Sequence, residues 1–182
     1  RPLAATSDKK STKEVSRSHK IDISPSGLIS VLGGKWTTYR KIAEDAIDTA
    51  ISINKLKKKK CRTEKTKLFG YKKNVDWSDH MHVYGSLKKK VESLGGNEDN
   101  KSLSSKFYIS NNIIEWSIIH EMALTLEDVL ARRTRCVFLD SNESKRIAPG
   151  VAKKMAEILD KDQVWIDTEL KNFNKLIKNY TV

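Results

Sequence analysis

The 182-residue sequence has little cysteine and no long hydrophobic run. Its two cysteines, Cys61 and Cys136, are far apart and show no metal-ligand spacing, so we expect no metal site and a reducing compartment. No run approaches the roughly 18 apolar residues of a membrane span, so we expect no segment to cross a bilayer. The glycine-rich fingerprints of nucleotide sites are also missing, as are G-x-S-x-G and paired CxxC motifs. The chain therefore cannot build a complete nucleotide site by itself.

Positive charge is what the sequence has in excess. The formal net charge is +12, and the stretch from Lys55 to Lys73 holds ten basic residues against the single acid Glu64, a local charge of +9. Such a stretch could attract phosphate backbones or anionic lipid headgroups. Because no aromatic residues interleave with the lysines of the run 57–60, a solvated loop is the favoured interpretation.

The pattern of apolar residues predicts a mainly α fold with one short β-hairpin. Residues 17–24 alternate as a half-buried strand does, the turn 25–27 follows, and residues 28–32 return as the second strand. A helix is predicted from Lys35 or Trp36 to Ile53. We expect residues 1–54 to be the edge of a sheet-containing domain, residues 55–76 a lysine-rich linker, and residues 77–182 an all-helical domain.

Helix caps divide the predicted helical domain. A helix is expected over residues 77–94, ended by two glycines, and a second one, buried on more than one side, begins after Asn111 or Asn112. Acidic residues after Thr125 predict the start of a third helix. A fourth helix is expected over roughly residues 143–159, and Pro149 either starts it or kinks it. Asp162 caps the last helix. Cys136 is expected to be buried and Cys61 exposed.

The strand-to-helix corner Gly33–Gly34 is the first candidate site. Two glycines let a backbone pass close to a ligand, and the following helix start offers unpaired N–H groups and a positive dipole end. A Gly-Gly pair by itself is more often a tight turn without a ligand, so the case for a ligand site depends on the residues around it. Arg1, Arg17 and Lys35 could converge on a phosphate or carboxylate, although most arginines are surface groups.

The four histidines differ in their settings. His19 lies in the first strand beside Arg17, the only histidine near the candidate corner, and it could touch a substrate. His80 and His82 are expected on different faces of a helix, which argues against a shared metal. His120 is expected to be a satisfied core or interface histidine. The run Asp140-Ser141-Asn142 has the spacing that begins a calcium-binding loop, but the turn glycine and the closing glutamate are absent, so we expect no calcium site there.

Blocks of the sequence resemble the FAD-dependent glycerol-3-phosphate dehydrogenases. The resemblance is carried by Arg1-Pro2-Leu3, Ser16-Arg17-Ser18-His19, the stretch Ser26–Asp45 that includes Gly33-Gly34-Lys35-Trp36-Thr37-Thr38, and His120–Arg135. Their order and spacing make the match specific, and it covers most of the chain. The resemblance implies an enzyme that oxidises sn-glycerol 3-phosphate to dihydroxyacetone phosphate, with FAD as hydride acceptor and a quinone as final acceptor.

The resemblance also implies roles for particular residues. Arg1, Arg17 and Lys35 would line the substrate site and act in catalysis, with His19 a further substrate contact. A second group would run along the pyrimidine side of the flavin: Gly33, Gly34, Lys35, Thr37 and Thr38. Negative charge that develops there on hydride transfer would be stabilised by the helix start and by Lys35. The cluster Arg132–Arg135 is expected to be structural, pairing with acids between the helical domain and the flavin domain.

The resemblance leaves part of the enzyme outside this sequence. Arg1 is not preceded by methionine and no signal-like segment follows it, so we expect a piece of a longer chain that needs its N-terminal FAD-binding part. We expect the piece alone to be inactive and to lack the calcium-binding hands of some animal members. A peripheral membrane surface and a homodimer are compatible partners, nucleic acid is not expected, and the location would be the mitochondrial inner membrane in a eukaryote or the cytoplasmic membrane periphery in a bacterium. The alternative is a basic helical module that binds nucleic acid or an anionic membrane through Lys55–Lys73.

Overall fold

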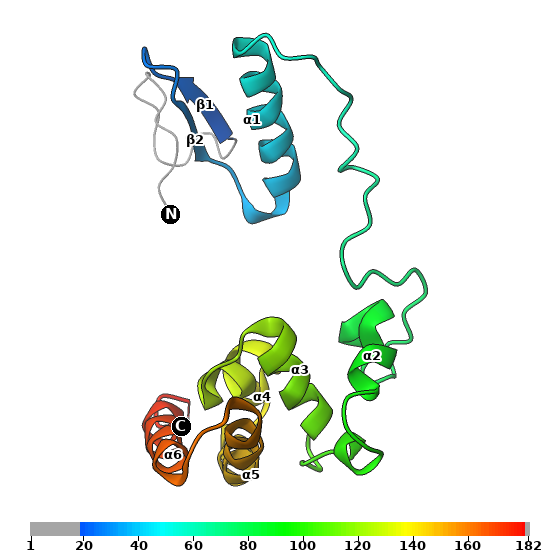
Figure 1. Cartoon of the computed structure of the whole chain (residues 1–182), viewed down its shortest axis with the longest axis vertical. Helices are drawn as coiled ribbons and strands as arrows, with labels where there is room; N and C mark the ends of the chain where they lie inside the picture. Colours follow the sequence, from blue (N-terminus) through cyan, green and yellow to red (C-terminus); the bar gives the residue numbers. More distant parts are fainter. Residues whose placement is uncertain (1–18, 181–182) are drawn as a thin grey trace. The chain divides into compact units, whose positions relative to one another are not determined.

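A computed structural model describes residues 19–180 of the chain, which divides into two compact units, Arg1–Leu68 and Phe69–Val182. In the first unit, strands β1 (His19–Ile23) and β2 (Ile29–Gly33) form an antiparallel hairpin in which Ile21 pairs with Val31. The 3-10 turn η1 (Trp36–Thr38) leads into helix α1 (Tyr39–Ile53), which runs beside the hairpin (Figure 1). The predicted hairpin and the helix after the glycine pair are confirmed.

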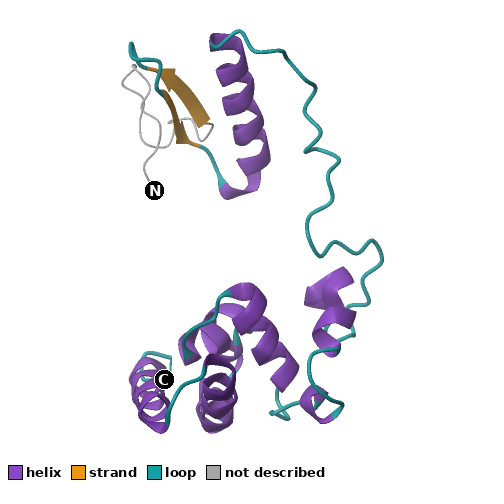
Figure 2. Ribbon diagram, viewed as in Figure 1, coloured by secondary structure: helices purple, strands orange, loops and turns teal. Residues whose placement is uncertain are grey.

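The second unit is helical throughout its regular structure (Figure 2). Its elements are η2 (His82–Leu87), α2 (Lys88–Glu92), η3 (Glu98–Asn100), α3 (Asn111–Glu121), the π-helical turn η4 (Asp128–Arg133), α4 (Cys136–Leu139), α5 (Ser141–Leu159) and α6 (Gln163–Ile177). The mainly α fold predicted from the sequence is confirmed.

The buried apolar core lies in the helical unit. Among the described residues, every buried apolar side chain falls between Met81 and Ile177. Helix α3 is buried around most of its circumference, since Ile113, Ile114 and Trp116 are all covered, as the sequence predicts. By contrast, the described part of the first unit buries only Gly34.

Side-chain caps set where the long helices begin. The carboxylate of Asp162 accepts the Trp165 amide at 2.9 Å and starts α6, as predicted. The carboxylate of Asp140 accepts the Glu143 amide at 2.8 Å, so α5 begins at Ser141 and carries Pro149 within it. Helix α3 is capped by Ser110 rather than by Asn111 or Asn112.

The continuous helix predicted over residues 77–94 is wrong. Asp79 accepts the Met81 amide at 2.9 Å in a turn, and only η2 and the short α2 follow. Gly85 interrupts η2 with φ +52°, and a Cβ atom there would lie 2.1 Å from the carbonyl oxygen of Gly70. The backbone of residues 70–72 therefore occupies the space that a continuous helix would need.

Candidate functional site

The corner between β2 and η1 depends on its two glycines. Gly33 and Gly34 have φ values of +76° and +78°, the left-handed region that residues with a Cβ atom rarely adopt. Gly34 is buried, and a Cβ atom on it would lie 2.3 Å from Cδ1 of Ile42 on α1. The glycine pair thus lets the chain reverse from strand to helix against the first turn of α1.

The residues after the glycines form a closed turn. The Thr38 hydroxyl accepts the Lys35 amide at 3.2 Å and donates to the Lys35 carbonyl at 3.0 Å. Lys35, Thr37 and Thr38 are all exposed, and no carboxylate of residues 19–180 pairs with the Lys35 amine. The corner therefore presents a fixed backbone with one uncompensated positive charge beside the start of a helix.

His19 lies close to this corner, opposite Gly33 in the β ladder. Its Nε2 atom is 3.0 Å from Oδ2 of Asp45 on α1, and the Lys41 amine is 2.8 Å from the other oxygen of that carboxylate. The hydrogen bond from Lys41, followed by the contact with His19, holds the pKa of Asp45 below its usual range. His19 is thus held to α1 by an ion-paired carboxylate. The remaining predicted site residues, Arg1 and Arg17, lie outside the described residues.

Two aromatic residues beside the glycines were not among the site residues predicted from the sequence. Trp36 is 86% exposed and Tyr39 is 51% exposed, with their ring centroids 5.8 Å apart. A tryptophan in the first turn of a helix, directly after Gly-Gly-Lys, was the signal that could have identified them. Rings of this size left exposed indicate a surface suited to contact with something else.

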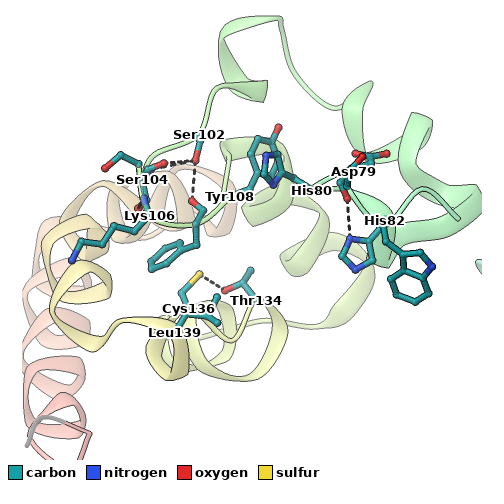
Figure 3. A pocket seen from close by; sticks show the side chains of 14 residues that line it. Asp79, His80, His82, Ser102, Ser104, Lys106, Tyr108, Thr134, Cys136 and Leu139 are labelled. Atoms are coloured by element: carbon teal, nitrogen blue, oxygen red, sulfur yellow. Dashed lines mark hydrogen bonds between the residues drawn. The ribbon is translucent and has the colours of Figure 1, made fainter.

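The helical unit has a pocket with a volume of about 450 Å³ (Figure 3). His80 stacks on Tyr108 with ring centroids 5.4 Å apart, and the Nδ1 atom of His82 is 2.8 Å from the Asp79 carbonyl. The Thr134 hydroxyl, which also lines the pocket, donates a hydrogen bond to the Val129 carbonyl. Within residues 19–180 no group of three or more histidine, cysteine, aspartate or glutamate side chains is placed to hold a metal ion.

His120 and Arg132 belong to the second block of the resemblance. His120 is exposed in the described unit, so it is not a core histidine, and its ring lies against Trp116 with centroids 4.1 Å apart. The alternative, an interface histidine, stays a prediction. The resemblance predicts that Arg132 pairs with acids between two domains, but its partners are Glu127 and Asp128 of its own helical unit, the latter at 2.7 Å and with i,i+4 spacing. This arginine is structural, as expected, but it does not need acids from another domain.

None of the helices within residues 19–180 is long and apolar enough to span a membrane.

Comparison with known proteins gives the family of the chain. Residues 29–164 match the C-terminal domain of alpha-glycerophosphate oxidase. Similar curated proteins include mitochondrial glycerol-3-phosphate dehydrogenase of Mesocricetus auratus, 31% identical over 97% of this chain and 27% of the relative, and the probable enzyme of Dictyostelium discoideum, 33% identical over 99% and 31%. A mitochondrial glycerol-3-phosphate dehydrogenase of Arabidopsis thaliana is 30% identical over 91% of this chain and 31% of its own length. The chain spans less than a third of the length of these relatives. The family match covers the strand-to-helix corner and the helical unit as far as the start of α6, and the chain therefore belongs to the family of the C-terminal domain of alpha-glycerophosphate oxidase.

Proposed function

We propose that the chain is the C-terminal part of an FAD-dependent glycerol-3-phosphate dehydrogenase and supplies part of its flavin and substrate site. The observation that carries the proposal is the corner Gly33–Gly34–Lys35, which joins two positive-φ glycines, an uncompensated amine and a helix start. Family membership and the names of the relatives support it.

The corner fits an isoalloxazine ring. Gly33 is exposed and has no Cβ atom, so a ring edge can approach its backbone, while Gly34 makes the turn against Ile42 that sets the corner. The first turn of the helix leaves amide N–H groups without intrahelical acceptors. When bound, FAD would supply the hydride acceptor for oxidation of the secondary alcohol of glycerol 3-phosphate to the ketone, with the hydroxyl proton passing to a base. The chain's own contribution is to place backbone N–H groups and the Lys35 charge where negative charge develops, with Thr37 and Thr38 continuing the contact.

The substrate side of the proposal uses the positive groups near the corner. The guanidinium groups of Arg1 and Arg17 would bind the phosphate of the substrate, since their planar donor fork matches phosphate oxygens. His19, held by Asp45 at 3.0 Å, would present its ring to the substrate in a fixed orientation. Lys35 would bridge the substrate and flavin portions of the site.

The rest of the proposal concerns the complete protein. The N-terminal part would hold the FAD diphosphate, and a quinone would take the electrons. Because the relatives carry the word mitochondrial in their names, we place this protein in mitochondria, at the inner membrane where a lipid-soluble quinone is available.

The test uses the full-length protein. It should show flavin absorbance that bleaches when glycerol 3-phosphate is added, and Lys35→Ala should lower kcat/KM by a factor of about 30 or more, which corresponds to ~2 kcal/mol of lost transition-state stabilisation. Arg17→Ala should have a comparable effect. Lys20→Ala is the matched control, because within residues 19–180 that exposed lysine pairs with Asp22 of its own strand and with no other carboxylate. A protein without flavin, or near-normal turnover in both site variants, would contradict the proposal.

A further inference from the structure

The basic segment, residues 55–68, carries most of the chain's excess charge. It contains eight basic residues and one acid. The lysines 57–60 are all exposed, and none of them forms an ion pair with a carboxylate of the described residues. The segment forms no helix or strand. Four adjacent uncompensated charges on an extended backbone create a strong local positive potential.

An apolar groove lies beside this charge. The segment turns back along α1, where Nη1 of Arg40 is 3.3 Å from Oγ1 of Thr63. Between helix and segment is a groove of about 190 Å³. Its apolar lining comes from Ala43, Ile47 and Ile51 of α1, and Lys59 of the segment also lines it. The carboxylates of Glu44 and Asp48 line it as well, and that of Glu44 is paired with the Arg40 guanidinium at 3.0 Å. Ile47 is 61% exposed, so the apolar lining is open to the outside in the described unit.

Aliphatic side chains bracket the basic segment. Leu56 at its start is 60% exposed and Leu68 at its end is 70% exposed, and the next residue, Phe69, is 84% exposed. A nucleic-acid phosphate backbone offers leucine no apolar contact. The interfacial zone of a bilayer, by contrast, can bury apolar side chains while the lysine amines stay at the headgroups. Single-stranded nucleic acid would instead use aromatic rings between the lysines, and no aromatic residue occurs from Lys57 to Lys67.

We propose that the basic segment and the α1 groove beside it bind the surface of an anionic phospholipid bilayer. Lysines 57–60 take the negative headgroups, Leu56 and Leu68 enter the interfacial layer, and the groove over Ile47 receives part of an acyl chain. The proposal does not rest on the dehydrogenase activity, since neither flavin nor substrate takes part in the contact.

The test measures sedimentation of the full-length protein with phosphatidylcholine vesicles, with and without phosphatidylglycerol. Phosphatidylglycerol should raise binding at least about tenfold, and added salt should reverse the gain, because each lysine near an anionic leaflet contributes roughly a factor of five. The quadruple variant K57Q/K58Q/K59Q/K60Q should lose about tenfold or more. Ile47→Ser should weaken binding several-fold and leave the salt dependence unchanged.

A matched control separates local from total charge. The variant K161Q/K171Q/K175Q/K178Q removes the same four charges from exposed positions of the helical unit for which the described residues provide no ion pair. It should bind vesicles within about twofold of the original protein. Equal losses in both quadruple variants would overturn the proposal, as would binding indifferent to phosphatidylglycerol. Tighter, lysine-dependent binding of a single-stranded RNA would also overturn it and assign the segment to nucleic acid.

Discussion

His19 on β1 and Asp45 on α1 face each other across the first unit, with 3.0 Å between Nε2 and Oδ2. The contact joins the strand that begins opposite the glycine corner to the helix that follows that corner. Because Lys41 holds the second oxygen of the same carboxylate, Asp45 is fixed from both sides. The geometry of the proposed site therefore depends on an aspartate that is not itself part of it.

Replacing Asp45 tests this dependence. Asp45→Asn removes the charge that attracts both His19 and Lys41, and should raise the hydrogen-exchange rates of the β1 amides severalfold, with a smaller effect on the middle of α1. Asp48→Asn, one turn further along the same helix and without an ion pair in the described residues, is the control and should leave exchange unchanged. Unchanged exchange in both variants would show that the His19–Asp45 contact does not hold the strand.

The local pattern of the sequence was enough to predict the corner. A β-branched run, two glycines and an i, i+4 apolar pattern indicate the strand, the turn and the helix in that order. The positive φ angles of Gly33 and Gly34 are ones that glycine adopts readily. The exposure of Trp36 could not be predicted in the same way, because it depends on which residues pack against the ring, and these are distant in sequence.

In the helical unit, long-range contacts overrode the local pattern. Apolar spacing over residues 77–94 favours a helix, but the close approach of Gly70 to Gly85 is set by residues distant in sequence. His120 lies on the exposed side of α3, a helix whose broad apolar surface leaves the orientation of this position open. Arg132 pairs with Asp128 at i,i+4 spacing and with Glu127 one residue earlier, and these contacts within one unit are a local feature that the resemblance to a two-domain enzyme does not indicate.

Gly85 should be among the least replaceable residues of the helical unit. An alanine there would need φ near +52° and would place its Cβ atom 2.1 Å from a backbone oxygen that cannot swing away. We expect Gly85→Ala to lower the free energy of unfolding by about 2 kcal/mol or more. Gly96→Ala is the control, because its Cβ atom would meet no atom within 4 Å. Urea unfolding followed by far-UV circular dichroism measures both, and equal midpoints would contradict this view of the turn.

The two cysteines should react very differently with thiol reagents. Cys136 is 1% exposed, and burial raises the pKa of its thiol, so both access and thiolate content are low. Cys61 is partly exposed at the edge of the α1 groove. In native protein, a maleimide should label Cys61 at least about a hundredfold faster than Cys136, with the rates converging in urea. Mass spectrometry of the peptides gives both rates, and Cys61→Ser removes the fast phase. Equal native rates would show that the core around Cys136 opens readily.

Glu143 should make the helical unit sensitive to acid. Its carboxylate lies 2.7 Å from Nη2 of Arg146 and also accepts the Ser104 hydroxyl, and these contacts lower its pKa from 4.5 to about 2. Because the folded-state pKa is depressed, the stabilisation is fully present above pH 4.5 and is lost as pH falls toward 2. Glu143→Gln should therefore lower Tm at neutral pH by a few degrees, and the difference should vanish near pH 2. Exposed Glu157→Gln is the control. A Tm difference that does not change with pH would refute the charge argument.

The two units should differ in how firmly they hold their structure. Every buried apolar side chain of the described residues belongs to the helical unit, whereas the hairpin has Val31 at 41% and Leu32 at 47% exposed. Two strands with an uncovered apolar face are marginal in water, and their stability must come from a further layer. In the 182-residue chain we expect the amides of Ile21 and Val31 to exchange in seconds to minutes, and those of α3 and α5 at least about a thousandfold more slowly. In the full-length protein the hairpin amides should become protected if a sheet of the N-terminal part covers them. Strong protection of Ile21 and Val31 in the shorter chain would contradict this, because β1, β2 and α1 would then be a stable unit without any added surface.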